Sequence, residues 1–163
     1  MRLALKITLV ALLTVAPHLA QAQGTNVAFA GLKTDTTQPV KVTADQLSVN
    51  QADGTATFTG NVVIVQGDMK VQAGTVLVHY SADKKAIQSL HAEGGVTVAA
   101  GTDAATSETA DYMPDSGELI LQGAVVLTQG QAAISGQKLT LSLKSGTGTM
   151  EGRVTTIFTP GKN

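Results

Sequence analysis

Apolar and polar side chains alternate along most of this 163-residue chain. The run from 56 to 67 shows the alternation most clearly, because every second position is apolar or glycine: Ala56, Phe58, Gly60, Val62 and Ile64. A period of two predicts a β-strand with one buried face. Thr, Val and Gly dominate the runs, whereas helical periodicity is nearly absent, so we predict an all-β fold.

The alternating pattern recurs at a nearly fixed spacing. Four runs carry a glycine at their centre, on the apolar face, separated by steps of 34, 29 and 29 residues: Gly60, Gly94, Gly123 and Gly152. A second landmark precedes each glycine: Ala44, Ala73, Ser107 and Gly136. One five-residue insertion around 81–85 accounts for every irregularity. The sequence therefore predicts about four stacked repeats of ~29 residues.

Turn-forming residues separate the two alternating runs of each unit: Asn50–Gly54, Ser81–Lys85, Pro114–Gly117 and Lys144–Gly146. Glycine supplies a positive φ at such places, and Asp, Asn and Ser bond the local backbone. The central glycines need another explanation, since glycine inside a strand marks a bulge, a bend or a close approach. We predict that they bend the sheet, with direct ligand contact as the alternative.

One face of the predicted strands is apolar throughout and the opposite face carries Thr, Ser, Gln, Asn and Lys. Such one-sided apolarity over many strands indicates a sandwich, a barrel or a solenoid with a single interior. The chain has no Trp, three Phe and two Tyr, so this interior is lightly filled. It is either a packed core of small side chains, which the composition alone favours, or two sheets held apart by an apolar ligand.

The first 22 residues are expected to be a cleaved signal peptide. Arg2 and Lys6 precede the apolar run 7–16, and Ala20-Gln21-Ala22 is a small-x-small cleavage site. The apolar run has about ten residues, short of the roughly 20 that span a bilayer. A retained membrane anchor is the alternative. We expect residues 23–38 to form a flexible lead-in and 39–160 to form the folded domain, with Pro39 opening an edge strand.

Charge and cysteine content narrow the class of function. Removing the signal peptide leaves 9 basic against 12 acidic side chains, a net charge of −3 without a basic cluster, which disfavours nucleic-acid binding. The chain has no Cys, so an exported domain would be held together by burial and strand pairing alone. We expect the protein in the periplasm or outside the cell.

The sequence offers little catalytic chemistry. His79 and His91 are the only histidines after the signal peptide, and the alternation places both on the polar face. No serine lies in a nucleophile-elbow pattern, and carboxylates such as Asp45, Asp68 and Asp111 fall singly. We therefore expect no catalytic residues, no metal ligands and no cofactor.

Three segments resemble the OstA-like family of periplasmic lipopolysaccharide-transport proteins. They are 34–45, which opens the mature chain, 58–67 with its Phe-Thr-Gly-Asn-Val core, and 153–158, which resembles the family's closing strand. The resemblance covers Thr34 to about Pro160 and implies a twisted, incompletely closed antiparallel β-jelly-roll. It also implies lipopolysaccharide acyl chains in an apolar groove, and a bridge between an inner-membrane complex and an outer-membrane translocon that share the fold.

The resemblance assigns the apolar face to a lipid-binding groove. The expected groove residues are Val40, Val42, Leu47, Val49, Phe58, Val62, Ile64, Val76, Val78, Val96, Val98, Tyr112, Leu119, Leu121, Val125, Leu139 and Leu141. The family also implies head-to-tail homo-oligomers through strand edges, here Val40, Val42, Thr156, Ile157 and Phe158. Together these features predict a non-enzymatic lipopolysaccharide carrier. The alternative is an exported structural β-solenoid or surface repeat protein without a lipid ligand.

Overall fold

The computed structural model describes residues 25–28 and 32–159, and the predicted signal peptide lies outside them. These residues form β1 (Thr25–Ala28), β2 (Lys41–Thr43), β3 (Gln46–Asn50), β4 (Thr55–Gln66), β5 (Met69–Tyr80), β6 (Ile87–Ala100), β7 (Asp103–Met113), β8 (Glu118–Gln129), β9 (Ala132–Ser142), β10 (Thr147–Glu151) and β11 (Thr155–Phe158). Within the same residues, no helix has the length and apolarity to cross a bilayer.

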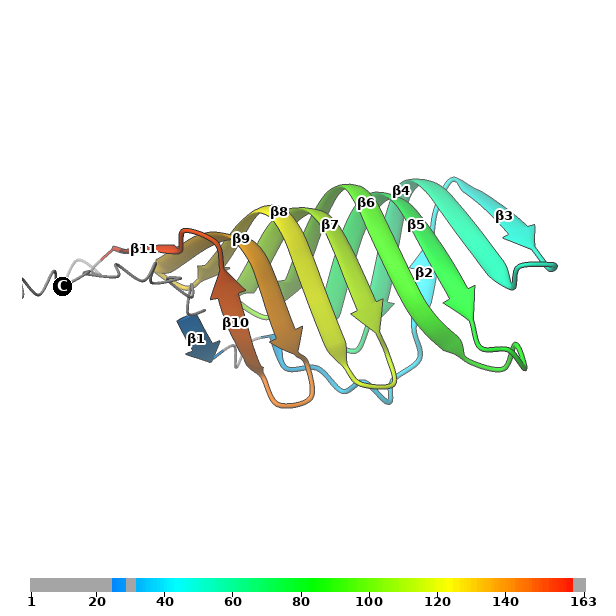
Figure 1. The fold of residues 1–163 in the computed structure, drawn as a ribbon, viewed down its shortest axis with the longest axis horizontal. Helices are drawn as coiled ribbons and strands as arrows, with labels where there is room; N and C mark the ends of the chain where they lie inside the picture. The colour runs from blue at the N-terminus through cyan, green and yellow to red at the C-terminus, as the bar shows by residue number, and fades with distance from the viewer. Residues whose placement is uncertain (1–24, 29–31, 160–163) are drawn as a thin grey trace, which may run out of the picture.

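The strands form one antiparallel sheet in the order β1-β10-β9-β8-β7-β6-β5-β4-β2, with β3 also on β4 and β11 also on β9. Neighbours from β4 to β9 are consecutive in the chain, so the sheet grows one hairpin at a time, and its first and last strands do not pair. Figure 1 shows these long strands side by side, with β3 at one end and β11 at the other. The fold is the expected twisted, incompletely closed jelly-roll, whereas the number of repeats stays a prediction.

β-Bulges near the centres of β4, β6 and β8 bend the sheet across all six long strands. The register shifts at this point in every pair from β4–β5 to β8–β9. In β8 the bulge is Gly123 with φ +82° followed by Ala124 with φ +45°, and Gly60, Gly94 and Gly152 begin equivalent pairs with φ of +80°, +82° and +83°. An extra residue bends a strand and increases its twist. The bend predicted from these glycines is therefore present.

The bend divides the sheet into two leaves. Leaf A comprises β2, β11 and the half-strands 62–66, 69–73, 96–100, 103–107, 125–129 and 132–136. Leaf B comprises β1, β3, β10 and the half-strands 55–59, 75–80, 87–93, 109–113, 118–122 and 138–142. At the two ends the bend separates whole strands, because β2 and β3 pair with the two halves of β4, and β11 and β10 with those of β9.

The apolar faces of both leaves pack against each other as a single core. Its fully buried members include Leu119, Leu121, Leu127, Leu139 and Met150, each at most 1 % exposed. Alternation along each half-strand places these side chains inward and polar ones outward. The side chains pack in one interior between the leaves, as the one-sided pattern predicts.

The hairpin turns form two rims around the opening between the leaves, which we call the mouth. Rim A consists of the two-residue turns 67–68, 101–102 and 130–131, each beginning with a glycine of positive φ. Rim B consists of the longer turns 51–54, 81–86, 114–117 and 143–146. The predicted insertion around 81–85 lies in a rim B turn, where extra residues leave the strands unchanged.

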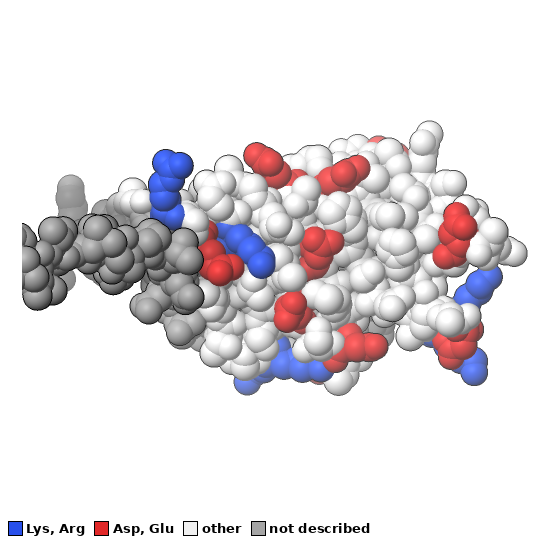
Figure 2. Space-filling view, in the orientation of Figure 1, with Lys and Arg blue, Asp and Glu red and all other residues white. Residues whose placement is uncertain are grey.

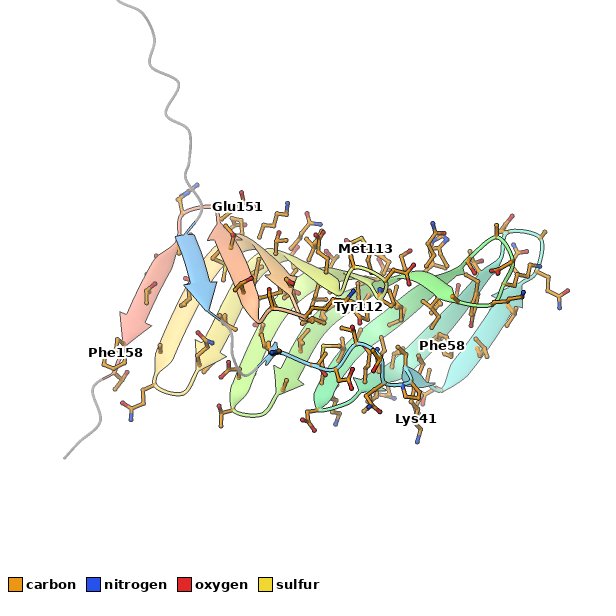
Figure 3. All side chains as sticks on the ribbon, turned by 90° about the horizontal axis from the view of Figure 1, so that it is seen from below. Lys41, Phe58, Tyr112, Met113, Glu151 and Phe158 are labelled. Atoms are coloured by element: carbon orange, nitrogen blue, oxygen red, sulfur yellow. The ribbon has the colours of Figure 1, made fainter. Side chains whose placement is uncertain are left out.

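Described residues of the expected lead-in 23–38 contact the folded sheet. Thr25–Ala28 pairs with β10 as strand β1, and Leu32 is only 1 % exposed in the common core. We call residues 32–38 the strap. It runs below the sheet between β10 and β2 in Figure 1 and crosses the view from below in Figure 3. The sequence gives no sign of this placement, because the strap is polar and its hydrogen bonds are made to Gln66 and Leu143, far along the chain.

Candidate functional site

Two rows of inward side chains run across leaf B from one end to the other. In the first, strand pairing aligns Val49, Ala56, Val78, Leu90, Tyr112, Leu119 and Leu141. In the second it aligns Leu47, Phe58, Val76, Ala92, Ala110, Leu121, Leu139 and Met150. Directly paired residues share one face of a sheet. Leaf B thus presents a continuous apolar surface to the interior.

Leaf A has two largely apolar inward rows and one mixed row next to rim A. The row beside the bend pairs Val62 with Ala73, Val96 with Ser107 and Val125 with Gly136. The middle row aligns Val42, Ile64, Val71, Val98, Ala105, Leu127 and Ile134. The row next to rim A contains Gln66, Met69, Ala100, Asp103 and Gln129. Asp103 is 6 % exposed, and its Oδ2 accepts a hydrogen bond of 2.9 Å from Gln129 Nε2. Hydrogen-bonding groups therefore line the mouth on one side.

Most of the expected groove residues lie together in the core. The buried ones are Val62, Ile64, Val76, Val78, Val96, Val98, Tyr112, Leu119, Leu121, Val125, Leu139 and Leu141, and the partly buried ones are Val40, Val42 and Phe58. Leu47 and Val49 differ, since 57 % and 60 % of their surface is exposed. Strand pairing still places both on the inward face, so the interior continues to this end of leaf B uncovered.

The uncovered end of leaf B borders a cavity of about 410 Å³. Its lining combines the two exposed side chains of β3 with the start of β4, Tyr80 and the turn residue Lys84. The Nζ of Lys84 donates a hydrogen bond to the carbonyl oxygen of Gln51, which fixes the lysine above the turn. The cavity therefore opens the apolar interior at this end, beside one basic group.

Gln66 is the last residue of β4, beside rim A, and is 2 % exposed. Its Oε1 accepts a hydrogen bond of 2.6 Å from the hydroxyl of Tyr112, which belongs to leaf B. Its Nε2 donates to the carbonyl oxygens of Thr36 and Gln38, at 3.0 and 2.9 Å. One buried amide thus joins leaf A, leaf B and the strap. The sequence contained a signal for the inward position of Gln66, since this residue continues the alternation of Val62 and Ile64.

Burial of Tyr112 raises the pKa of its phenol above the ordinary value of 10.0. A phenolate in an apolar interior loses hydration, so the neutral form is favoured. The neutral hydroxyl is also the form that can donate to Gln66. Tyr112 therefore keeps its link across the interior at neutral pH.

Thr34 bonds both rims at once. Its amide donates to the carbonyl oxygen of Leu143 in a rim B turn, at 3.2 Å, and its hydroxyl donates to the carbonyl oxygen of Gln66, beside rim A, at 3.1 Å. Asp35 shapes the next turn by accepting from the amide and the hydroxyl of Thr37. The hydroxyl of Thr37 and the other donors hold the pKa of Asp35 below its usual value. The strap closes the mouth at this point.

The outer face of leaf B carries both histidines, as predicted. His91 Nδ1 lies 2.6 Å from Asp111 Oδ1 on the adjacent strand, and both side chains are partly exposed. A shallow hollow of about 250 Å³ lies beside them, lined by Thr57, Thr75, Leu77, His91 and Glu93. Within the described part of the chain, no group of three or more His, Cys, Asp or Glu could hold a metal ion.

The predicted edge residues divide between the two ends. Val40 and Val42 are partly buried against the core, whereas Thr156, Ile157 and Phe158 are exposed on β11. β11 pairs with β9 on one side, and no other described strand borders it. Figure 2 shows acidic and basic side chains scattered on this face of the molecule without a basic patch among the described residues.

A family model described as LptA/(LptD N-terminal domain) LPS transport protein matches residues 41–147. An uncharacterized protein of Rhizobium meliloti (strain 1021) is 30% identical over 135 residues, which cover 78% of this chain and 73% of that protein. The lipopolysaccharide export system protein LptA of Haemophilus influenzae is 28% identical over 146 residues, 83% of this chain and 84% of the relative. These matches confirm the resemblance seen in the sequence.

Two further matches concern one segment and the fold. The lipopolysaccharide export system protein LptA of Escherichia coli (strain K12) is 43% identical over 44 residues, covering 27% of this chain and 24% of that protein. The crystal structure of LptH of Pseudomonas aeruginosa, the LptA homologous periplasmic component of a lipopolysaccharide transport device, superposes with a TM-score of 0.69. It is 18% identical and covers 78% of this chain and 99% of its own, so it supports the fold alone.

Proposed function

This chain belongs to the family of LptA and LptD N-terminal-domain lipopolysaccharide transport proteins, and we propose that it carries lipopolysaccharide by holding the acyl chains between its two leaves. The role is that of a carrier in the periplasm and needs no chemical step. It would join an inner-membrane complex to an outer-membrane translocon. The observation that carries the proposal is the continuous apolar surface of leaf B, which reaches the exposed Leu47 and Val49.

The hydrophobic effect makes the binding of acyl chains to this surface favourable. Acyl chains in water expose a large apolar area, at about 25 cal/mol per Å². An apolar surface that runs from strand to strand removes this penalty all along its length. The side chains on it are mostly small and aliphatic, so no single polar group of leaf B would hold the chains at one place. Such a surface suits acyl chains that move along it better than acyl chains that are held at one place.

Successive molecules are proposed to align their interiors head to tail. Among the described strands, β3 at one end pairs only with β4 and β11 at the other end pairs only with β9, so each end offers a strand edge. Such edges pair readily with a strand of another chain. A head-to-tail contact continues as a filament unless its rotation closes a ring. The oligomer would lengthen the apolar path.

Site-specific photocrosslinking tests the carrier role. A photoreactive residue at Leu47 or Phe58, both on the inward face, is expected to crosslink lipopolysaccharide in envelope preparations. Ser48 and Thr57 are the matched controls, since they neighbour these residues on the same two strands but face outward. Labelling from the inward pair alone would support the groove.

Equal labelling from inward and outward positions would overturn the acyl-chain groove and favour a structural role. A further set buried more deeply, at Ile64, Leu121 and Leu141, then maps how far the ligand enters. Labelling at Leu47 that never extends to these positions would restrict the lipid to the open end and contradict passage through the interior.

A further inference from the structure

We propose that the strap, residues 32–38, is a displaceable cover of the mouth that occupies the place where the acyl chains would lie, and that Gln66 is the residue that holds it closed. The inference rests on the proposed carrier function. It goes beyond that function because it assigns a closed state to this chain and names the contacts that must break before lipid can enter.

The interior as it stands is filled by the protein itself. Val76, Val98, Leu121 and Leu127 are fully buried, and Leu32 of the strap belongs to the same core at 1 % exposure. A cavity of about 410 Å³ lies at the β3 end, outside this packed region. Close-packed interiors leave no room for an added chain without a shift of some element. Lipid binding therefore requires part of the protein to move.

The strap is the element whose departure would open the mouth. It bonds both rims through Thr34, and Gln66 fixes it through the carbonyl oxygens of Thr36 and Gln38. Ladders of backbone bonds join neighbouring strands within each leaf, whereas these few bonds hold the strap. Elements that move on binding come from the part of a protein with few such contacts.

Gln66 couples the strap to the interior. The same amide that holds the strap accepts the hydroxyl of Tyr112 across the space between the leaves. A lipid chain passing along the mouth has to separate Tyr112 from Gln66, and this leaves the amide free to turn and release the carbonyl groups of the strap. In the closed state every one of these buried groups has its partner, so closure is stable without ligand.

Disulfide locking tests this directly, because the chain has no native cysteine. A Cβ placed on Gly67 would lie 3.0 Å from Thr34 Oγ1. A disulfide requires about 3 Å between one sulfur and the opposite Cβ, given its S–S bond of about 2.04 Å. The double variant Thr34→Cys with Gly67→Cys therefore ties the strap to rim A when oxidised and frees it when reduced.

A matched control joins two neighbouring turns of one rim without crossing the mouth. A Cβ on Gly117 would lie 2.9 Å from Lys144 Cγ, the position that a cysteine sulfur would take. Gly117 has φ +71° and Gly67 has φ +56°, so both double variants place a cysteine at a positive φ. Gly117→Cys with Lys144→Cys thus reproduces the substitutions and the strain but leaves the strap free.

The measurement is binding of purified lipopolysaccharide to each variant, oxidised and reduced. The strap lock is expected to reduce binding about tenfold or more when oxidised, and reduction restores it, whereas the control binds equally in both states. Equal binding by the oxidised and reduced strap variants would overturn the strap proposal and leave the carrier function intact. No binding by the wild-type protein would overturn the carrier function, and the strap proposal with it.

A second variant removes the hydrogen bonds by which Gln66 holds the strap. Gln66→Leu keeps the size of the side chain but cannot bond Thr36, Gln38 or Tyr112, so its affinity for lipopolysaccharide is expected to rise about tenfold if a closed state competes with binding. Hydrogen exchange at the amide of Thr34 reports the strap itself and should accelerate in this variant and in lipid-bound wild type. Protection of that amide by bound lipopolysaccharide would contradict displacement.

Discussion

The two ends of the folded sheet expose opposite leaves. At the first end, leaf B extends as β3, whose inward Leu47 and Val49 are exposed, while Val42 of leaf A is partly buried. At the last end, Phe158 on β11 of leaf A is 67 % exposed, while Met150 of leaf B, on β10 between β9 and β1, is fully buried. Each end thus leaves inward side chains of one leaf exposed.

The difference between the middle and the ends of the sheet shows that side chains with the same inward pattern can be either buried or exposed. A residue of either leaf is buried only where the other leaf lies opposite it. In the middle of the sheet both leaves are present, and the rows of inward side chains form a core. At the first end the rows of leaf B continue to Leu47 and Val49, which the opposite leaf does not cover. The proposed lipid or second molecule would cover these side chains.

The largest expected effect compares two leucines on one row. Leu121 lies in the middle of the second leaf B row, and Leu47 lies at its first end. Leu121→Ala should reduce the free energy of unfolding by about 2–5 kcal/mol, because it leaves a cavity in a packed core. Leu47→Ala should change it by less than about 0.5 kcal/mol, since the side chain is exposed. Urea unfolding measures both. Similar losses would show that Leu47 is covered in solution.

The second prediction concerns the bend that both ends share. Gly94 and Gly95 both have φ +82°, but only a Cβ on Gly94 would meet backbone, 3.2 Å from the Cα of Gly74, whereas one on Gly95 would meet nothing within 4 Å. Either alanine carries the strain of a positive φ, about 1–2 kcal/mol. Gly94→Ala should lose roughly 1–3 kcal/mol more, because the two backbones cannot separate without disturbing the ladder.

Gly95→Ala is the control for conformational strain in this pair. Thermal unfolding at one protein concentration gives the comparison. If the two variants melt together, then close approach of β5 and β6 at the bend is not needed, and glycine serves there only through its φ.

The third prediction sharpens the difference between the ends. Light scattering by the wild-type protein should rise with concentration as head-to-tail oligomers form. The amide of Thr159 bonds Gln131, so the alternation of antiparallel pairing turns the amide of Thr156 away from β9. Thr156→Pro removes this edge N–H and should weaken association about tenfold, or about 1.4 kcal/mol. Thr156→Val keeps the N–H and the β-branched shape and serves as the control. If the wild-type protein stays monomeric at every concentration, the edge of β11 has no role in assembly.

The smallest effect concerns the Tyr112 bond across the interior. Tyr112→Phe should reduce the free energy of unfolding by about 0.5–1.5 kcal/mol at neutral pH. Because the pKa of Tyr112 is raised above 10.0 in the folded protein, its contribution is complete below pH 10 and is lost as the pH rises through the higher folded value. The gap between wild type and variant should therefore shrink above pH 10.

Tyr80→Phe controls for the loss of a tyrosine hydroxyl elsewhere in the protein. Denaturant unfolding at several pH values between neutrality and strong alkali gives the gap for both variants. A Tyr112→Phe gap that stays constant with pH would contradict the burial of the phenol between the leaves.

The sequence by itself determined the local architecture. The alternation predicted which side chains face inward, and the turn residues placed the hairpins of rim B. The spacing of Gly60, Gly94, Gly123 and Gly152 indicated a bend, and each of these glycines has φ near +80°. These features were accessible because strand periodicity, turns and bulges depend on a few neighbouring residues. The resemblance to a transport family came from such local patterns and was confirmed.

Only the tertiary structure decided which residues meet across the interior. Nothing in the alternation indicates that Gln66 of leaf A bonds Tyr112 of leaf B, 46 positions away, or that Thr34 bridges the rims. Those contacts depend on the twist accumulated over several bulged strands, which sets how far one leaf is displaced along the other. The same displacement exposes Leu47 and Val49 although their pattern is that of buried residues. Local periodicity fixes the face of a side chain, and the relative position of the leaves decides whether that face is covered.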